Sequence, residues 1–468
     1  YLDFKWKNIM KSKKVSRRAF LTTVSAGAAA MASSNVVKPL ESISTNIYLK
    51  SDISKLAALG GEPVVNNKVW PKWPYVDEQI VESLSKTVRS GRWNRIDDNL
   101  NGAVPTFEKR YAQLLGVKGC VTTGSGTQAL HTVVEAMGFG PGDEIITTPY
   151  TDMGTISAII SARALPVMVD LDKESFQLDP KEVEKKINKN TVAIMPVHMM
   201  GQPCDLDSIL SIAKKHNLKV IEDACQAHLA EHRGQKLGSL GDAGCFSFQT
   251  SKTICCGEGG GIISNNEKLL NDCYTVMNHG TNKEGRSVTI GPKYRMNQFE
   301  ATILLEQLKH AQEQFETRSR NAAFLTSKLK DFKGLVPQKM YHKTDKGSYY
   351  LYTMAFHKEY WNNVHRNVFL KAIAAEGIEL SPYIKNGLHR EPWTDNILSR
   401  REYKTMYSAE RLQQFKSDLF LPACDWVCDN MVMLWASGPL LANEKDMEDV
   451  INAIMKVYEN RDKLHLIS

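Results

Sequence analysis

The sequence predicts an α/β fold in which a mostly parallel sheet is sandwiched by helices and is followed by a smaller C-terminal α+β domain. The first observation is alternation, because strand-like apolar runs at 164–172 and 191–199 flank a helical stretch at 180–187. Such alternation is typical of parallel strands joined by crossover helices. The second observation is size: 468 residues, of which 42% are hydrophobic and 24% charged, can build two or three domains with a large core.

We expect two domains to follow each other along the chain. Residues 55–320 would form an N-terminal arm and a large domain, and residues 321–468 a small C-terminal domain. Helical periodicity covers the segments 76–90, 104–115, 299–318 and 445–458. The third of these segments is expected to bridge the two domains.

The N-terminal residues have the features of an export signal. Arg17 and Arg18 precede a short, weakly apolar run with small residues at Ala30 and Ala32. This pattern predicts a twin-arginine (Tat) signal peptide at 1–32 that is cleaved after about Ala32. The protein would then be periplasmic or otherwise extracytoplasmic. The alternative is a basic, alanine-rich tail, which would leave the protein in the cytoplasm.

The region around this signal gives three further expectations. Residues 33–54 have the composition of a linker. The SRRAFL motif normally lies near the start of a chain, which makes Met10 an alternative start. The apolar run at 19–32 is too short to span a membrane as a helix, and no other stretch is long and apolar enough.

The charge distribution does not favour a nucleic-acid partner. The formal net charge is +7, but residues 1–32 carry seven Lys or Arg and one Asp, so the body of the protein is near neutral. The nine cysteines are too sparse for a disulfide framework in a chain of this length. We expect most of them to be buried as small hydrophobic residues.

Two short apolar strands in the stretch 218–261 are followed by reactive side chains. The run Val220-Ile221 predicts a buried strand that ends at Asp223 and continues into the helix-compatible ACQAHLAEH. A second strand, predicted around Ser247, is followed by Lys252 and then by the backbone-permissive GEGGG. An acid and a lysine are therefore expected at neighbouring strand ends, with a hydroxyl group between them.

Pyridoxal 5′-phosphate (PLP) chemistry requires these kinds of side chain. The cofactor needs a lysine amine to hold it as a Schiff base, a carboxylate to keep its pyridine nitrogen protonated, and donors for its phosphate. Lys252, Asp223 and Ser247 can fill these roles. Each is a weak signal alone, because most lysines in glycine-rich loops are surface residues and an aspartate after a strand is often a helix cap. Their order and spacing strengthen the interpretation.

A glycine-rich turn, TGSGT, opens a predicted helix near residue 126. The N-terminus of a helix presents free N–H groups and the positive end of the helix dipole, so it is suited to bind an anion. Alone, such a turn is more often only the start of a capped helix. Next to the lysine and the acid, we expect Gly126, Thr127 and Gln128 to contact the phosphate of PLP.

Several of these motifs together resemble a known family. The segments VIEDACQAH, GDAGCFSFQTSK and GEGGG are similar to the signature of the DegT/DnrJ/EryC1/StrS family, and the resemblance runs from about Leu56 to the C-terminus. It implies the fold type I architecture of PLP-dependent aminotransferases. It also implies a transferase of sugar or cyclitol biosynthesis that moves an amino group from glutamate or glutamine to a keto sugar or keto cyclitol.

The resemblance assigns roles to further residues. It implies that Gln226 reaches the phenolic oxygen of PLP, and that the other subunit of a homodimer offers Lys293 to the phosphate. For Lys293 the alternative is an exposed basic turn. His228 is also a family position, but as a residue in a sequence it is equally compatible with a structural role.

One departure from the family concerns the substrate side of the site. The family usually has an aromatic residue on the face of the cofactor ring where this chain has Asp152. Either Asp152 meets a polar or cationic part of the substrate, or Tyr150 supplies the aromatic face. The loop that contains His389, and Tyr383 before it, match a family segment near the substrate.

Other functions remain open from the sequence. Sugar dehydratases related to this family have a histidine at the lysine position, whereas this chain has Lys252. A different PLP reaction on an amino acid is a second alternative, because fold does not fix function. An exported PLP-binding protein without transaminase activity is a third. No metal site is expected, because His198 and Cys204 lack a second matched pair of ligands.

Overall fold

The computed structural model describes residues 55–98 and 101–467. The predicted export signal at 1–32 and the predicted linker at 33–54 both lie outside the described residues. Within the described part of the chain, no helix has the length and apolar character needed to cross a membrane.

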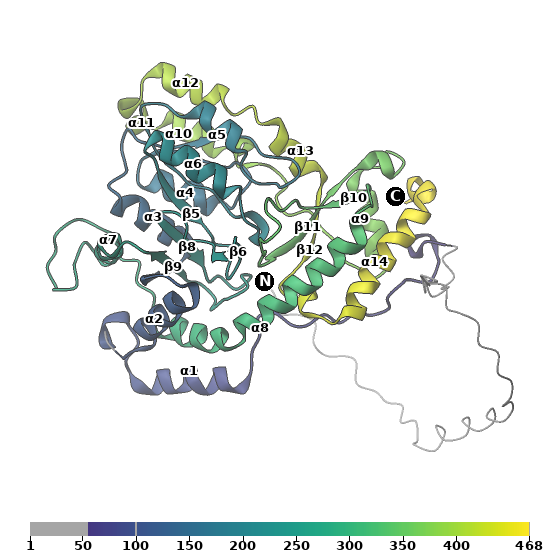
Figure 1. The fold of residues 1–468 in the computed structure, drawn as a ribbon, viewed down its shortest axis with the longest axis horizontal. Coiled ribbons are helices and arrows are strands. Elements are labelled where there is room, and N and C mark those ends of the chain that lie inside the picture. The colour runs from purple at the N-terminus through teal and green to yellow at the C-terminus, as the bar shows by residue number, and fades with distance from the viewer. Residues whose placement is uncertain (1–54, 99–100, 468) are drawn as a thin grey trace, which may run out of the picture. The chain divides into compact units, whose positions relative to one another are not determined.

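The large sheet has seven strands in the order β1-β9-β8-β5-β4-β2-β3. Figure 1 shows β9, β8 and β5 side by side in this sheet. Of these, β9 runs antiparallel to both of its neighbours, and the pairs from β8 to β3 are parallel. The prediction of a mostly parallel α/β sheet is therefore confirmed. The strands are β1 (Gly119–Thr123), β2 (Glu144–Thr147), β3 (Leu165–Met168), β4 (Thr191–Ile194), β5 (Lys219–Asp223), β8 (Ala243–Ser247) and β9 (Gly260–Ser264).

Helices cover both faces of this sheet. One face packs against α3 (Gly126–Ala136), α4 (Met153–Ser161) and α7 (Glu267–Met277). The other packs against α2 (Ala103–Leu115), α5 (Pro180–Lys186), α6 (Leu206–His216) and the first part of α8 (Gln298–Leu329). Alternate strand residues enter different cores, so Ile221 and Cys245 pack on the α3 side and Phe246 packs on the α2 side.

Helix α8 is longer than its sequence pattern predicts. The prediction ended at residue 318, whereas the helix continues to Leu329. Ala322, Leu325 and Leu329 are buried in a second hydrophobic core, which stabilises the extra turns. The helix begins with a capping box, in which the Asn297 side chain and Glu300 each accept from the other's backbone N–H.

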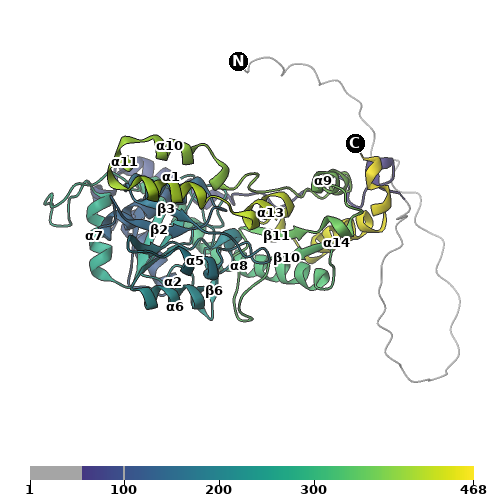
Figure 2. The same cartoon turned by 90° about the horizontal axis from the view of Figure 1, so that it is seen from above.

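The second core surrounds a three-stranded antiparallel sheet in the order β10-β11-β12. Figure 2 shows α8 and α14 beside these strands. The elements of this part are β10 (Leu335–Pro337), β11 (Leu351–Phe356), β12 (Met431–Trp435), α9 (Arg366–Ala375) and α14 (Glu444–Glu459). The buried side chain of Trp361 packs at its centre.

Four further helices connect β11 to β12. They are α10 (Trp393–Ser399), α11 (Arg401–Met406), α12 (Ala409–Ser417) and α13 (Pro422–Asn430). The first three contact the edge of the large sheet, where the Tyr403 hydroxyl donates to the Ala164 carbonyl at 3.1 Å. The arm before the large domain carries α1 (Glu78–Ser90), which ends at Gly91 as the sequence predicts. A two-stranded hairpin is formed by β6 (Glu231–His232) and β7 (Gln235–Lys236).

The segment ACQAHLAEH after β5 is not a helix, so this expectation was wrong. It forms a series of turns, in which Ala227 N–H donates to the Ala224 carbonyl at 2.8 Å and Ala230 N–H to the Ala227 carbonyl at 3.2 Å. Leu229 adopts a φ of 64°, in the left-handed region, which a helix does not tolerate. The Ala224 N–H is used by the sheet instead, because it donates to the Cys245 carbonyl at 2.9 Å.

Candidate active site

A cavity of about 370 Å³ lies at the carboxyl edge of the large sheet. This is the edge at which ligands bind in open α/β sheets. The lining comes from segments that follow β1, β2, β4, β5 and β8, together with two tyrosines from the C-terminal part. The residues are Ser125, Gly126, Thr127, Leu130, Thr151, Asp152, Gly154, Thr155, Val197, Asp223, Cys225, Gln226, Ser247, Gln249, Ser251, Lys252, Glu258, Tyr350 and Tyr383.

Asp223 is the last residue of β5, and its side chain faces the α3 side of the sheet because it lies two positions after Ile221. It is buried, and its Oδ2 accepts from the Thr155 hydroxyl at 2.7 Å. Its Oδ1 accepts from the Cys225 N–H at 3.2 Å. The Thr155 hydroxyl also lies 2.8 Å from that of Thr151. These contacts fix the orientation of the carboxylate in the cavity.

Lys252 enters the same cavity from the turn that follows β8. The turn is closed by the Lys252 N–H, which donates to the Gln249 carbonyl at 2.8 Å. Its ammonium nitrogen lies 4.4 Å from the centre of the Tyr350 ring. The hydroxyl of Tyr350 lies 2.9 Å from that of Ser251. The structure therefore brings Lys252 and Asp223 together from two neighbouring strands.

The N-terminus of α3 closes one side of the cavity. Ser125 caps this helix, and its hydroxyl accepts from the Gln128 N–H at 3.2 Å. A Cβ at Gly126 would lie 2.8 Å from the Ser247 Cβ and 2.9 Å from the Cys225 sulfur. Only glycine therefore allows this close approach, which puts Gly126, Thr127 and Ser247 around one corner of the cavity.

Gln226 and Tyr383 line another part of the wall. The Gln226 Oε1 accepts from the Met200 N–H at 2.7 Å, and its amide donates to the Tyr383 hydroxyl at 3.3 Å. Burial raises the pKa of Tyr383 well above its usual range, and the charges of Tyr350 and Asp152 act in the same direction. Asp152 itself is exposed at this wall and caps α4, since its Oδ1 accepts from the Gly154 N–H at 2.8 Å.

Two predicted site residues from the large domain do not line the cavity. Tyr150 is fully buried between the large sheet and α13, and burial raises the pKa of its hydroxyl well above the usual range. It is therefore unable to supply the aromatic face of the site in this arrangement. Gln128 lies in the first turn of α3, and its side-chain oxygen lies close to Gly124 and outside the cavity lining.

His389 and Lys293 also lie apart from the cavity. The His389 ring is buried, and its Nε2 lies 3.0 Å from Asp425 Oδ1, which holds it against α13. Burial lowers the pKa of His389 below its usual value. Lys293 is exposed and forms a backbone bridge with Asn278. A site composed of this chain alone does not use either side chain.

His228 has a structural role. Its Nε2 lies 2.8 Å from the Ser247 carbonyl and its Nδ1 lies 2.8 Å from the Tyr111 hydroxyl. The ring packs between Phe246 and Phe248, at centroid distances of 5.2 Å and 5.3 Å. Burial lowers its pKa to about 3, so it is neutral at physiological pH. It supports the end of β8 from the face opposite to the cavity.

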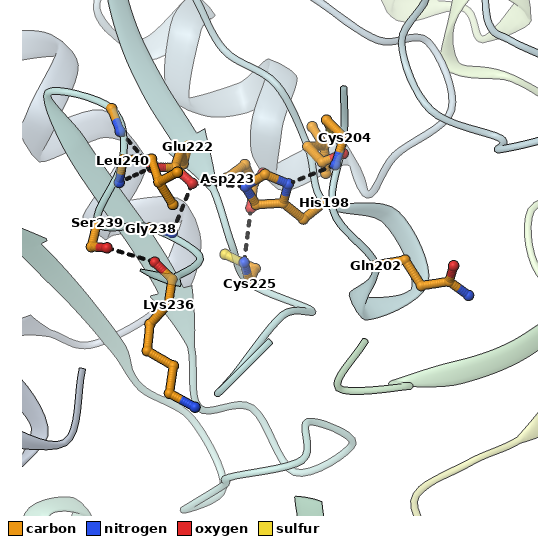
Figure 3. Close-up of polar contacts among 12 residues, drawn as sticks. His198, Gln202, Cys204, Glu222, Asp223, Cys225, Lys236, Gly238, Ser239 and Leu240 are labelled. Carbon is orange, nitrogen blue, oxygen red and sulfur yellow. Dashed lines mark hydrogen bonds and ion pairs between the residues drawn. The ribbon is translucent and has the colours of Figure 1, made fainter. Parts of the chain in front are cut away.

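Glu222 precedes Asp223 in β5, so its side chain lies on the opposite face of the sheet, where it is fully buried. Figure 3 shows its polar contacts. Cys204 N–H donates to His198 Nδ1 at 3.2 Å, so the His198 proton is on Nε2, which donates to Glu222 at 2.9 Å. Three backbone N–H groups, of Gly238, Leu240 and Gly241, donate to the same carboxylate at 2.7, 2.8 and 2.6 Å.

Burial by itself would raise the pKa of Glu222. The hydrogen bonds from His198 and the backbone outweigh it and hold this pKa below the usual value. His198 thus donates to this carboxylate, and the Cys204 N–H holds the His198 ring in the orientation that this requires. In the described part of the chain, no three His, Cys, Asp or Glu side chains gather in a way that could hold a metal ion.

Sequence reasoning missed several residues of the cavity. Thr151 and Thr155 have the i, i+4 spacing of a helix start, which was a usable signal. Tyr350 had none, because it lies 98 positions after Lys252 and reaches the cavity only through the fold of β11.

Known proteins resemble this chain over most of its length. The model of the DegT/DnrJ/EryC1/StrS aminotransferase family matches residues 74–430. The L-glutamine:2-deoxy-scyllo-inosose aminotransferase of Streptoalloteichus tenebrarius is 32% identical over 87% of this chain and 99% of its own length. The L-glutamine:scyllo-inosose aminotransferase of Streptomyces griseus is 31% identical over 86% of this chain and 97% of its own length.

The solved structures show the same fold. The crystal structure of 3-amino-5-hydroxybenzoic acid synthase has a TM-score of 0.72 and 25% identity to this chain. The match covers 84% of this chain and 99% of that structure. The fold is therefore that of the fold type I PLP-dependent aminotransferases.

Proposed function

The chain belongs to the DegT/DnrJ/EryC1/StrS aminotransferase family, and from that premise we propose that it transfers the amino group of glutamine to a keto cyclitol, with PLP as its cofactor. The observation that carries this proposal is the placement of Lys252 and Asp223 in one cavity at the carboxyl edge of the sheet. The two relatives described above, which act on glutamine and an inosose, support the choice of donor and acceptor.

The residues of the cavity fit PLP. Lys252 would hold the cofactor covalently, and Asp223 would lie against its pyridine nitrogen. The corner formed by Gly126, Thr127 and Ser247 combines the N-terminus of α3, where glycine leaves the backbone accessible, with two side-chain hydroxyl groups. A phosphate is bound by groups of these kinds. Gln226 would meet the phenolic oxygen. When bound, PLP supplies an electron sink for the charge that develops at the carbon bearing the amino group.

The side chains of the protein then have separate tasks. The Lys252 amine accepts a proton from the substrate carbon and returns it, as a general base and acid. Asp223 would keep the pyridine nitrogen of PLP protonated, because its carboxylate stabilises the positive charge there. The hydrogen bond from the Thr155 hydroxyl holds that carboxylate in place. Tyr350 restricts the Lys252 side chain through its ring.

The charges of the cavity favour a cyclitol over a nucleotide-linked sugar. Among the described residues that line it, Lys252 is the single lysine or arginine, whereas Asp152 and Glu258 add negative charge. A pyrophosphate is recognised by arginine or lysine side chains, and these are absent from this part of the lining. An uncharged or cationic ring therefore fits better, with Asp152 as a contact for its polar groups.

We also propose a homodimer in which the partner's Lys293 reaches the phosphate. The segment 278–297 exposes Val288 and Ile290, the latter at 94% of its surface. Exposed apolar residues of this kind favour an interface. Mixing the inactive Lys252→Ala and Lys293→Ala proteins tests this, because hybrid dimers would regain one intact site. If mixing restores no activity, Lys293 does not act across subunits.

Export through the twin-arginine pathway is a further proposal, supported by Arg17, Arg18 and the alanine-rich run after them. Fusion of residues 1–32 to a folded reporter tests it. Secretion that is lost in the Arg17→Lys, Arg18→Lys variant is the expected result, and a reporter retained in the cytoplasm would refute it.

Label transfer tests the reaction itself. The purified protein, loaded with PLP, is incubated with glutamine labelled at its α-nitrogen and with scyllo-inosose, and the aminated cyclitol is followed by mass spectrometry. Labelled product is expected from the native protein and not from Lys252→Ala. Failure with glutamine and glutamate, and with both a keto cyclitol and a nucleotide-linked keto sugar, would favour a PLP-binding protein without transaminase activity.

A further inference from the structure

Arg318, on α8, is buried without a negatively charged partner. Its side chain is 1% exposed, and none of the described carboxylates lies within ion-pair distance of it. Burial lowers its pKa to about 9. A buried cation without a counter-ion costs free energy, so its contacts must offset that cost.

The guanidinium of Arg318 contacts two residues from opposite ends of the chain. It lies 4.9 Å from the centre of the Trp73 ring, at cation–π distance. Its Nη2 donates to the Ser437 carbonyl at 3.5 Å. Trp73 belongs to the N-terminal arm, and Ser437 follows β12, so Arg318 joins the arm to the C-terminal part.

Both of these residues hold the turn that carries Lys252. The Trp73 indole N–H donates to the Thr250 carbonyl at 3.0 Å. The Ser437 hydroxyl donates to the Ser251 carbonyl at 3.0 Å. The two carbonyls directly before Lys252 are thus each bound by a residue that touches Arg318.

We infer that Arg318 is a positioning residue for Lys252, acting through Trp73 and Ser437. It does not line the cavity, so it has no direct contact with a substrate there. Its effect is to hold the residues 249–252, named here the Lys252 turn, at a fixed distance from Asp223. The inference rests on the proposed function only in taking Lys252 as the reacting amine.

Arg318→Met tests this inference, and Arg366→Met is a matched control. Arg366 is also a buried arginine whose contacts are backbone carbonyls, those of Cys428 at 2.7 Å and Met431 at 2.8 Å. It lies on α9 and does not contact the Lys252 turn. Both variants remove a buried cation, and only one removes the support of the turn.

Amide hydrogen exchange is the first measurement, made by mass spectrometry on the PLP-loaded protein. In Arg318→Met, exchange at the Ser251 and Lys252 amides is expected to rise about tenfold, since the turn opens more often. In Arg366→Met this exchange is expected to stay native. Equal increases in both variants, or no increase in Arg318→Met, would overturn the inference. This readout does not need turnover, so it remains decisive even if the proposed reaction fails.

Kinetics provide the second measurement. A displaced lysine slows the chemical step, so kcat in Arg318→Met is expected to fall about a hundredfold with little change in KM for the amino donor. Trp73→Phe keeps a ring against the guanidinium but removes the donor to Thr250, so it should show part of the exchange effect. If Arg318→Met does not fold, native exchange of the Lys252 turn in Trp73→Phe would overturn the inference.

Discussion

Replacement of Glu222 by glutamine changes one atom of a fully buried carboxylate that accepts four hydrogen bonds. Oε1 accepts from Leu240 and Gly241, and Oε2 accepts from His198 and Gly238. The new amide group would face two of these donors with N–H groups of its own. Two hydrogen bonds to a charged acceptor are lost, each worth about 1.5–3 kcal/mol, so Glu222→Gln is expected to cost roughly 3–6 kcal/mol.

The assay is a thermal melt of the native protein and the variant at several pH values. The pKa of Glu222 is lowered in the folded state, so its stabilisation is present above its unfolded pKa and is lost as the pH falls through the lower folded value. The melting temperature of the variant should therefore be several degrees lower at neutral pH. It should also fall less on acidification than that of the native protein.

A matched control is Glu184→Gln. Glu184 also accepts from a histidine and a lysine, His216 at 3.1 Å and Lys215 at 2.6 Å, but its side chain is 43% exposed. Exposed ion pairs contribute little, so this variant should melt as the native protein does. A melting temperature of Glu222→Gln within about one degree of the native value would refute the reasoning.

The other predictions concern the cavity and its support. Lys252→Ala is expected to abolish both transamination and the long-wavelength absorbance of the bound cofactor, while circular dichroism stays native; undiminished turnover would contradict the assignment. Thr155→Val removes the donor to Asp223 without a change of shape, so kcat/KM should fall about tenfold to a hundredfold, and a loss below about twofold would count against it. His228 has a folded pKa of about 3 against an ordinary 6.5, so its stabilisation is complete above pH 6.5 and is lost as the pH falls from there towards 3. His228→Gln should flatten the decline of the melting temperature between about pH 7 and 5, and an unchanged decline would show that other groups cause it.

The sequence predicted the parts of the site that lie close together along the chain. Asp223 and Ser247 end short apolar strands and Lys252 follows one of them, and parallel strands bring their carboxyl ends to one edge of a sheet. Gly126 opens a helix after a strand of the same sheet. For these residues the periodicity of the chain is enough to indicate a common site, because strand and helix geometry set the direction of each side chain.

The residues that sequence reasoning misplaced depend on packing between distant segments. Tyr150 lies next to cavity residues in the chain, but its ring enters the apolar core beside α13. His389 is bound by Asp425, and no local pattern shows that this partner is available. The segment after β5 has helical composition, yet its backbone N–H groups bind to the sheet and to Asp223.

The sequence by itself determined the fold class, the sheet edge that carries the site and the lysine and acid within it, because these follow from local periodicity and from the order of motifs. Only the tertiary structure decided what surrounds them. Tyr350 and the link from Arg318 to the Lys252 turn join segments far apart in the chain. Such contacts arise from the packing of whole domains. They cannot be predicted from the sequence, because side chains that meet across a core produce no periodic pattern in either segment.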